Sequence, residues 1–198
     1  MKKLTTKDRI VDAALRLFNE EGTKAVTTNH VAAAAGISPG NLYYHFRNKE
    51  EIIREIFSRL VEFTNSESTY GAGFRVKPSI ENLEEVFKRV LTLHWEYRFL
   101  YREFNALLNR DEELKYRIIK YQKDRLMEVR ESIREFINAG IFRKMDDAEI
   151  EFVKTTLWII GTYWHSYLEA NGRKITKARV EDGIGMLRRF LKPYMYKP

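Results

Sequence analysis

Hydrophobic positions in this chain recur every three or four residues over most of its length, a spacing that predicts helices. The first such stripe falls between Thr6 and Gly22. It consists of Ile10, Ala14, Leu17 and Phe18. No run of alternating apolar and polar residues indicates a strand. We therefore predict an all-α protein of about nine helices.

Capping residues and helix breakers divide the next segment, about 27–46, into two short helices. Thr28 is predicted to cap the first, and Gly36 to end it in a left-handed backbone conformation. Ser38 then caps the second, with Pro39 in its first turn, where a missing N–H costs nothing. The apolar residues expected to face inward are Val31, Ala32, Ala35, Leu42 and Phe46.

The pattern in the rest of the chain predicts longer helices separated by a few breaks. Asn48 is expected to cap a connecting helix that ends near residue 64, and the polar segment Asn65–Pro78, with Gly71 and Gly73, reads as a loop. Further helices are predicted after Ser79 to about Glu96, and from the bend at Tyr97 to about Asn109. Three more are predicted: one from Asp111 to Gly140, one from Asp146 to Gly172, and one from Thr176 to just before Pro193. This organisation suggests a small N-terminal domain, residues 1–50, and a larger helical domain, residues 51–198.

Composition limits the function classes but does not select one. The 198 residues include 44% hydrophobic side chains, enough for real cores, and no cysteine, which fits a reducing cytoplasm. The net charge of +7 favours a polyanionic partner only weakly. No window approaches the roughly 20 apolar residues that a membrane span needs. We expect a cytoplasmic protein without a membrane partner.

The segment from Thr27 to Ile52 closely resembles the N-terminal DNA-binding domain of the TetR family of bacterial transcriptional regulators. The residues that carry the resemblance are Thr27-Thr28, Val31-Ala32, Ala35-Gly36-Ile37-Ser38, Gly40, Leu42-Tyr43, His45-Phe46 and Asn48-Lys49-Glu50-Glu51-Ile52. The stretch Gly40–Phe46 looks like the recognition helix of multidrug-sensing members. The resemblance implies a three-helix domain that binds double-stranded operator DNA through a helix-turn-helix.

In a helix-turn-helix, the second helix enters the major groove with its N-terminal residues at the base edges. Gly40 would let the backbone approach DNA closely, and Asn41 and Tyr43 are the best candidates for base contact. The resemblance places five further residues at or near phosphates: Thr28, Ser38, Tyr44, His45 and Lys49. Alternatively, the rings of Tyr43 and Tyr44 cover the domain's core, and His45 packs against the first helix.

The C-terminal domain is expected to form a homodimer, because a two-fold dimer reads two half-sites at once. The last two helices carry apolar stripes that predict an interface. The residues assigned to it are Trp158, Gly161, His165, Leu168, Val180, Ile184, Leu187 and Leu191, with Gly183 permitting close approach. The alternative is that one of these stripes packs within its own chain.

Aromatic residues crowd two segments, His94–Tyr101 and Trp158–Tyr167, which suits a pocket for an apolar or amphipathic molecule. The residues chosen as ligand contacts are Trp95, Phe99, Tyr121, Tyr163 and Trp164. Arg98 and Arg102 could anchor an anionic head group. We expect no cofactor and no metal, because none of the four histidines has metal-ligand spacing.

These patterns favour a homodimeric transcriptional regulator, a repressor released from a palindromic operator by a small-molecule inducer. The chain has neither a glycine-rich phosphate loop nor a Gly-x-Ser-x-Gly motif, which argues against an enzyme. A DNA-binding architectural or cell-division factor with the same fold remains the alternative. In the favoured interpretation, the connecting helix after Asn48 transmits the effect of the inducer to the DNA-binding domain.

Overall fold

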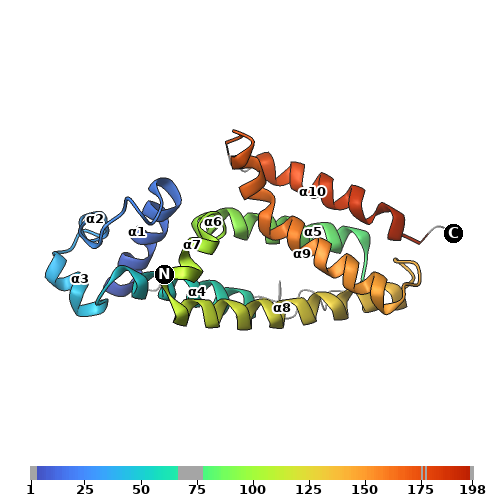
Figure 1. Cartoon of the computed structure of the whole chain (residues 1–198), viewed down its shortest axis with the longest axis horizontal. Coiled ribbons are helices and arrows are strands. Elements are labelled where there is room, and N and C mark those ends of the chain that lie inside the picture. The colour runs from blue at the N-terminus through green and yellow to red at the C-terminus, as the bar shows by residue number, and fades with distance from the viewer. Residues whose placement is uncertain (1–3, 67–77, 175, 177, 197–198) are drawn as a thin grey trace. The chain divides into compact units, whose positions relative to one another are not determined.

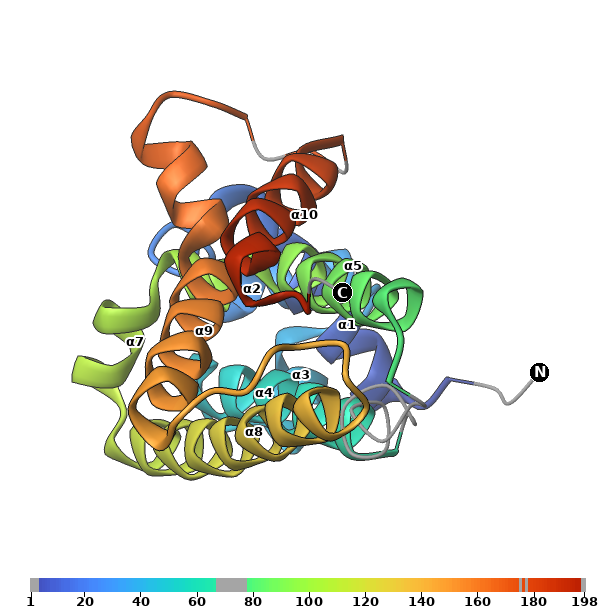
Figure 2. The same ribbon diagram turned by 90° about the vertical axis from the view of Figure 1, so that its right-hand side faces the viewer.

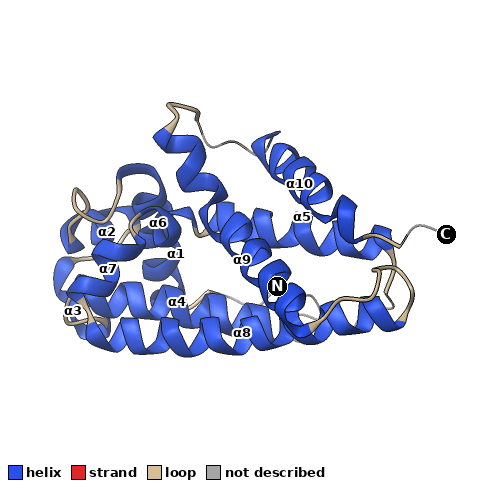
Figure 3. Cartoon of the chain, turned by 45° about the vertical axis from the view of Figure 1, so that its right-hand side comes forward, coloured by secondary structure: helices blue, strands red, loops and turns tan. Residues whose placement is uncertain are grey.

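The computed structural model describes residues 4–66, 78–174, 176 and 178–196, and the predicted loop glycines Gly71 and Gly73 lie outside them. The regular structure of the described residues is helical, which confirms the predicted all-α class (Figure 3). These residues form ten α-helices and a short 3₁₀ helix, η2: α1 (Thr6–Glu21), α2 (Thr28–Ala34), α3 (Pro39–His45), α4 (Lys49–Ser66), α5 (Ile80–Glu96), α6 (Arg98–Arg102), α7 (Phe104–Arg110), α8 (Glu112–Asn138), α9 (Asp147–Ala170), α10 (Ala178–Leu191) and η2 (Lys192–Tyr194).

The chain divides into two compact units. Unit 1 comprises residues 1–62 and 97–115, and unit 2 comprises residues 63–96 and 116–198. These packing units differ from the predicted division at residue 50, because the segment that holds α6 and α7 packs with the N-terminal helices. The predicted division concerns DNA binding and stays a prediction.

Unit 1 is built around the apolar faces of α1, α2 and α3, which contact one another in sequence order (Figure 1). The side chains at its centre are fully buried: Ile10, Ala14, Phe18, Val31, Ala32, Leu42 and Ile52. Phe99, from α6, is equally buried and lies 5.3 Å from Phe18 between ring centroids. Burial of these side chains is the main contribution to the stability of this unit.

Unit 2 has its core where α5, α9 and α10 pack against one another (Figure 2). The residues at its centre include Leu91, Val153, Trp164, Leu168, Ile184 and Leu187. Gly183 permits the close approach, because an added Cβ would lie 2.9 Å from both Leu91 Cδ1 and Trp164 Nε1. The glycine predicted to serve a dimer contact therefore serves the chain's own core.

Two predicted features of the helices need correction. Thr27, rather than Thr28, caps α2, and Thr28 is the first residue of the helix. The helix predicted between Tyr97 and Asn109 is two helices, α6 and α7, separated at Glu103, whose backbone leaves the helical conformation. The other predicted caps at Ser38, Asn48, Ser79, Asp111 and Asp146 are confirmed by hydrogen bonds to backbone N–H groups.

Candidate nucleic-acid interface

Local capping sets the geometry of the turn between α2 and α3. Thr27 and His30 cap the start of α2 reciprocally, since each side chain accepts a hydrogen bond from the other residue's backbone N–H. Gly36 ends the helix with φ 66°, a left-handed conformation that favours glycine. Ser38 Oγ then accepts from the backbone N–H of Asn41 at 3.2 Å. Leu42 and Phe46 point into the core, so the opposite side of α3 faces solvent.

The exposed side of α3 presents two tyrosines. Tyr43 is 51% exposed and Tyr44 is 85% exposed, so neither ring covers the core of unit 1. The Tyr43 hydroxyl lies 3.0 Å from the Thr28 hydroxyl at the start of α2. This hydrogen bond orients the ring relative to the neighbouring helix. The Tyr44 ring instead packs edge-on against His45, with centroids 5.1 Å apart.

The first turn of α3 offers small and polar groups. Gly40 and Asn41 are both exposed, and a Cβ added at Gly40 would meet no protein atom within 4 Å. Neither packing within the chain nor a positive φ therefore requires glycine at this position. The bare backbone gives closer access from outside, which suits contact with a phosphate or a base.

Lys49 has a structural role that the sequence analysis missed. Its ammonium group donates to the carbonyl oxygen of Thr23 and, at 2.9 Å, to that of Val26. These bonds connect the first turn of α4 to the loop before α2. An ammonium group has three donors, so Lys49 keeps one for a phosphate while it holds the loop.

Residues of α6 and of the break after it contact this loop and the end of α1. The Glu103 carboxylate accepts from the Thr23 hydroxyl and, at 2.9 Å, from its backbone N–H. Arg102 Nη2 donates to the carbonyl oxygen of Phe18 at 2.9 Å, and the Phe99 N–H donates to Asn19 Oδ1 at 3.1 Å. These partners lie about eighty residues apart in sequence. No local pattern could have revealed them.

The residues chosen as ligand contacts have different surroundings. Phe99 belongs to the core of unit 1, whereas Trp164 belongs to the core of unit 2 and donates from Nε1 to the carbonyl oxygen of Arg179 at 3.1 Å. Tyr163 is exposed, and Trp95 is half-buried. Tyr121 is also half-buried and lies against Arg125, whose guanidinium carbon is 5.5 Å from the ring centroid. Ligand contact by these residues stays a prediction.

The predicted dimer stripe on α9 and α10 faces the chain's own core. Six of its residues are buried within unit 2: Gly161, His165, Leu168, Ile184, Leu187 and Leu191. Trp158 is half-buried, and the side chain of Val180 lies outside the described residues. A side chain already buried in its own unit has no surface left for a second copy. The structure thus places these six residues in the core of unit 2, and a role for them in dimerisation stays a prediction.

A different face of α9 is apolar and exposed. Phe152, Ile159, Tyr163 and Tyr167 follow one another at intervals of seven, four and four residues, which places them on one side of the helix. Each of these four side chains is more than two-fifths exposed. Such a stripe on a long helix is typical of an interaction surface. We refer to these four residues as the α9 outer face.

The described part of the chain holds no group of three or more His, Cys, Asp or Glu side chains placed to bind a metal ion. None of its helices combines the length and the apolar character that crossing a bilayer requires.

Comparison with known proteins identifies the family. The family model described as "Bacterial regulatory proteins, tetR family" matches residues 10–56, and that described as "Bacterial transcriptional repressor" matches residues 65–198. The chain is 27% identical over 162 residues to the transcriptional repressor KstR2 of Rhodococcus jostii, covering 76% of this chain and 75% of that protein. The chain therefore belongs to the TetR family and is a DNA-binding transcriptional repressor.

Solved structures agree with this assignment. A TetR-family transcriptional regulator from Marinobacter aquaeolei superimposes with a TM-score of 0.86 at 28% identity, covering 97% of this chain and 92% of that one. The complex of SmeT with triclosan superimposes with a TM-score of 0.67 at 20% identity, covering 97% and 92%. The second likeness shows the fold alone.

Proposed function

We propose that this repressor acts as a homodimer, in which the α3 helices of two copies occupy successive major grooves of a palindromic operator. One observation carries the proposal: the exposed side of α3 combines an accessible backbone at Gly40 with polar side chains at Asn41 and Tyr43. A helix presented in this way matches the width of the major groove. Two-fold symmetry then doubles the number of base contacts.

Each residue of the interface has a distinct role in this proposal. Asn41 and Tyr43 contact base edges and supply sequence specificity. Thr28, Ser38, Tyr44, His45 and Lys49 contact phosphates and fix the register of the protein on the duplex. Ser38 can do this while it caps α3, because its oxygen accepts from Asn41 and its hydroxyl hydrogen can donate to a phosphate.

The α9 outer face is the proposed dimer interface. Its four apolar side chains would be buried by the same four residues of a second copy, as a two-fold contact requires. The interface assigned here thus replaces the buried stripe of α9 and α10. We also infer that the dimer acts in the cytoplasm, where it can bind chromosomal DNA.

A small apolar or amphipathic inducer is proposed to release the operator. SmeT, which has the same fold, has a solved structure in complex with triclosan, which supports a ligand of this kind. An inducer weakens operator binding if it binds more tightly to a dimer whose two α3 helices are spaced differently. The factor is the ratio of the inducer's affinities for that dimer and for the operator-binding dimer. The helix α4 starts at Lys49, in unit 1, and ends in unit 2, so it covalently joins the unit that carries α3 to unit 2.

The test is a titration of the full chain against its own upstream DNA, with random DNA of equal length as control. We expect protection of one palindrome whose half-sites lie about one helical turn, ~34 Å, apart or a multiple of it. Two chains should bind per palindrome. Dispersed binding without a discrete site would instead identify an architectural factor and contradict the proposal.

A further inference from the structure

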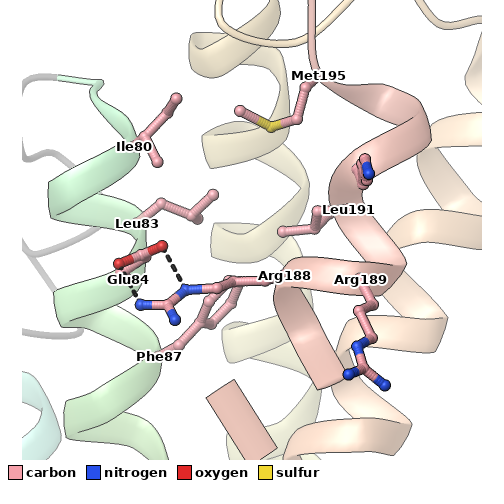
Figure 4. Close-up of a pocket in the computed structure, with 9 residues that line it drawn as sticks. Ile80, Leu83, Glu84, Phe87, Arg188, Arg189, Leu191 and Met195 are labelled. Atoms are coloured by element: carbon pink, nitrogen blue, oxygen red, sulfur yellow. Dashed lines mark hydrogen bonds and ion pairs between the residues drawn. The ribbon is translucent and has the colours of Figure 1, made fainter. Parts of the chain in front are cut away.

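Unit 2 contains an apolar pocket of about 280 Å³ between α5 and the C-terminal end of α10 (Figure 4). Its walls are formed by Ile80, Leu83, Phe87, Leu191 and Met195. The charged residues that line it are Glu84, Arg188, Arg189 and Lys192. None of these nine residues belongs to the aromatic set chosen as ligand contacts. The pocket is therefore a separate candidate site.

The walls of this pocket are held in place by contacts between distant parts of the chain. Arg188 on α10 forms two hydrogen bonds with Glu84 on α5, at 2.5 and 2.7 Å (Figure 4). The segment that carries Met195 is fixed by backbone hydrogen bonds on both sides, from the Arg143 N–H to the Tyr194 carbonyl and from the Tyr196 N–H to the Ile141 carbonyl, both 2.8 Å. The pocket is thus pre-formed, and a ligand would not have to order it.

Charge around the pocket is predominantly positive. The hydrogen bonds from Arg188 lower the pKa of Glu84, so this carboxylate stays ionised and neutralises one cation. Arg189 and Lys192 are exposed and form no ion pair with any residue that the structure describes. An apolar interior beside two cations that pair with no carboxylate among the described residues complements a molecule with an alkyl chain and a negative head group.

We propose that this pocket binds a free single-chain alkyl carboxylate. The alkyl chain lies between α5 and α10 against Leu83, Phe87 and Leu191, and the carboxylate lies at the edge where Arg189 and Lys192 can reach it. The volume of about 280 Å³ fits one alkyl chain of moderate length. The site stands independently of operator binding, which involves other residues.

The experiment measures binding of octanoate, nonanoate and decanoate to the full chain by isothermal titration calorimetry, below their micelle concentrations. Each added methylene should strengthen binding about fourfold until the pocket is full, as expected for burial of a methylene group. The alcohols of equal chain length are the matched ligands without charge. They should bind at least tenfold more weakly than the carboxylates.

Two double variants locate the site. Arg189→Glu with Lys192→Glu should weaken decanoate binding at least tenfold, whereas Arg173→Glu with Lys174→Glu, an equal change at exposed positions outside the pocket, should leave it unchanged. Equal losses in both variants, equal binding of decanol, or no binding of decanoate would each overturn the proposal. The proposal would also be overturned if Arg189→Glu with Lys192→Glu turned a dimer into a monomer, because a second copy of the chain would then fill the pocket. It would likewise be overturned if this variant lost binding to anionic vesicles and kept its binding of decanoate. Operator binding by the wild type is measured separately, so its failure is distinguishable.

Discussion

The hydroxyl oxygens of Thr28 and Tyr43 lie 3.0 Å apart, which connects the first residue of α2 to the exposed side of α3. Thr28 is predicted to contact a phosphate, and Tyr43 is predicted to contact a base. Their hydrogen bond means that the two contacts are coupled, because a phosphate that orients Thr28 also orients the tyrosine ring. Recognition of operator bases by Tyr43 should therefore depend on Thr28.

Tyr43→Ala is expected to cost about 1–3 kcal/mol of binding free energy on the operator and little on random DNA. Thr28→Val and Tyr43→Phe each remove one hydroxyl of the pair, and each should cost about 0.5–1.5 kcal/mol. The double variant should lose less than the sum of the single losses. Fluorescence anisotropy with both DNAs measures these values. Equal losses of Tyr43→Ala on both DNAs would remove this residue from the base contacts.

Gly40→Ala separates folding from DNA binding. The new methyl group meets no protein atom within 4 Å, and alanine is the better helix former, so the free energy of unfolding should rise by up to about 1 kcal/mol. Operator affinity should fall at least about tenfold, or 1.4 kcal/mol, because the methyl group would separate the backbone from DNA. Thermal unfolding and anisotropy provide the two readouts. Unchanged operator affinity would show that DNA does not approach this backbone.

Much of unit 1 was predictable because its signals are local. The positions of Gly36, Ser38 and Pro39 are sufficient to define the turn between α2 and α3, since each acts on a backbone within four residues of itself. The bonds of Glu103 to Thr23 and of Arg102 to Phe18 were not predictable, because they join residues about eighty positions apart. For the same reason, no local pattern indicated that residues 97–115 pack in unit 1.

The apolar stripes of α9 and α10 illustrate a different limit. Ile184 and Leu187 recur at helical spacing, which predicts a covered face but does not say whether the cover is the chain itself or a second copy. The structure supplies the answer, since Leu91 and Trp164 occupy the space beside Gly183. Periodicity predicts burial and not the identity of the partner, so it could not distinguish the chain's own core from a dimer interface.

Lys49→Ala should lower stability as well as DNA affinity. The ammonium group donates to the carbonyl oxygens of Thr23 and Val26, and loss of charge-assisted bonds of this kind costs about 1.5–3 kcal/mol. Lys24→Ala is the matched control, because Lys24 is exposed and close by in sequence. Chemical denaturation measures the difference. Equal stability of the two variants would mean that these carbonyl contacts contribute nothing, and Lys49 would then serve only a phosphate.

The dimer interface can be located by two substitutions to arginine. Ile159→Arg places a charge on the α9 outer face, where it should weaken dimerisation by about 3 kcal/mol or more, over a hundredfold, and leave each chain folded. Ile184→Arg buries the charge in the core of unit 2 and should unfold it. Sedimentation velocity and circular dichroism distinguish the two outcomes. A folded dimer of Ile159→Arg would place the interface elsewhere.

His94 should make the stability of unit 2 depend on pH. Its Nδ1 lies 2.8 Å from the carbonyl oxygen of Gly161, so the neutral ring carries its proton on Nδ1. Burial, together with the charge of His165, lowers the pKa of His94 to about 4, against a hydrogen bond to Gly161 that favours the charged form.

The sign of the pH dependence follows from this lowered pKa. Above pH ~6.5 the histidine is neutral in both the folded and the unfolded chain, and its contribution to stability is complete. As the pH falls from about 6.5 to 4, His94 becomes protonated in the unfolded chain but stays neutral in the folded chain. The free energy of unfolding therefore decreases by up to about 3 kcal/mol. His94→Gln should flatten this part of the profile. Urea unfolding followed between pH 4 and 8 measures the profiles of the wild type and the variant. A wild-type profile that matches that of His94→Gln would show that the ring is protonated in the folded chain as readily as in the unfolded one.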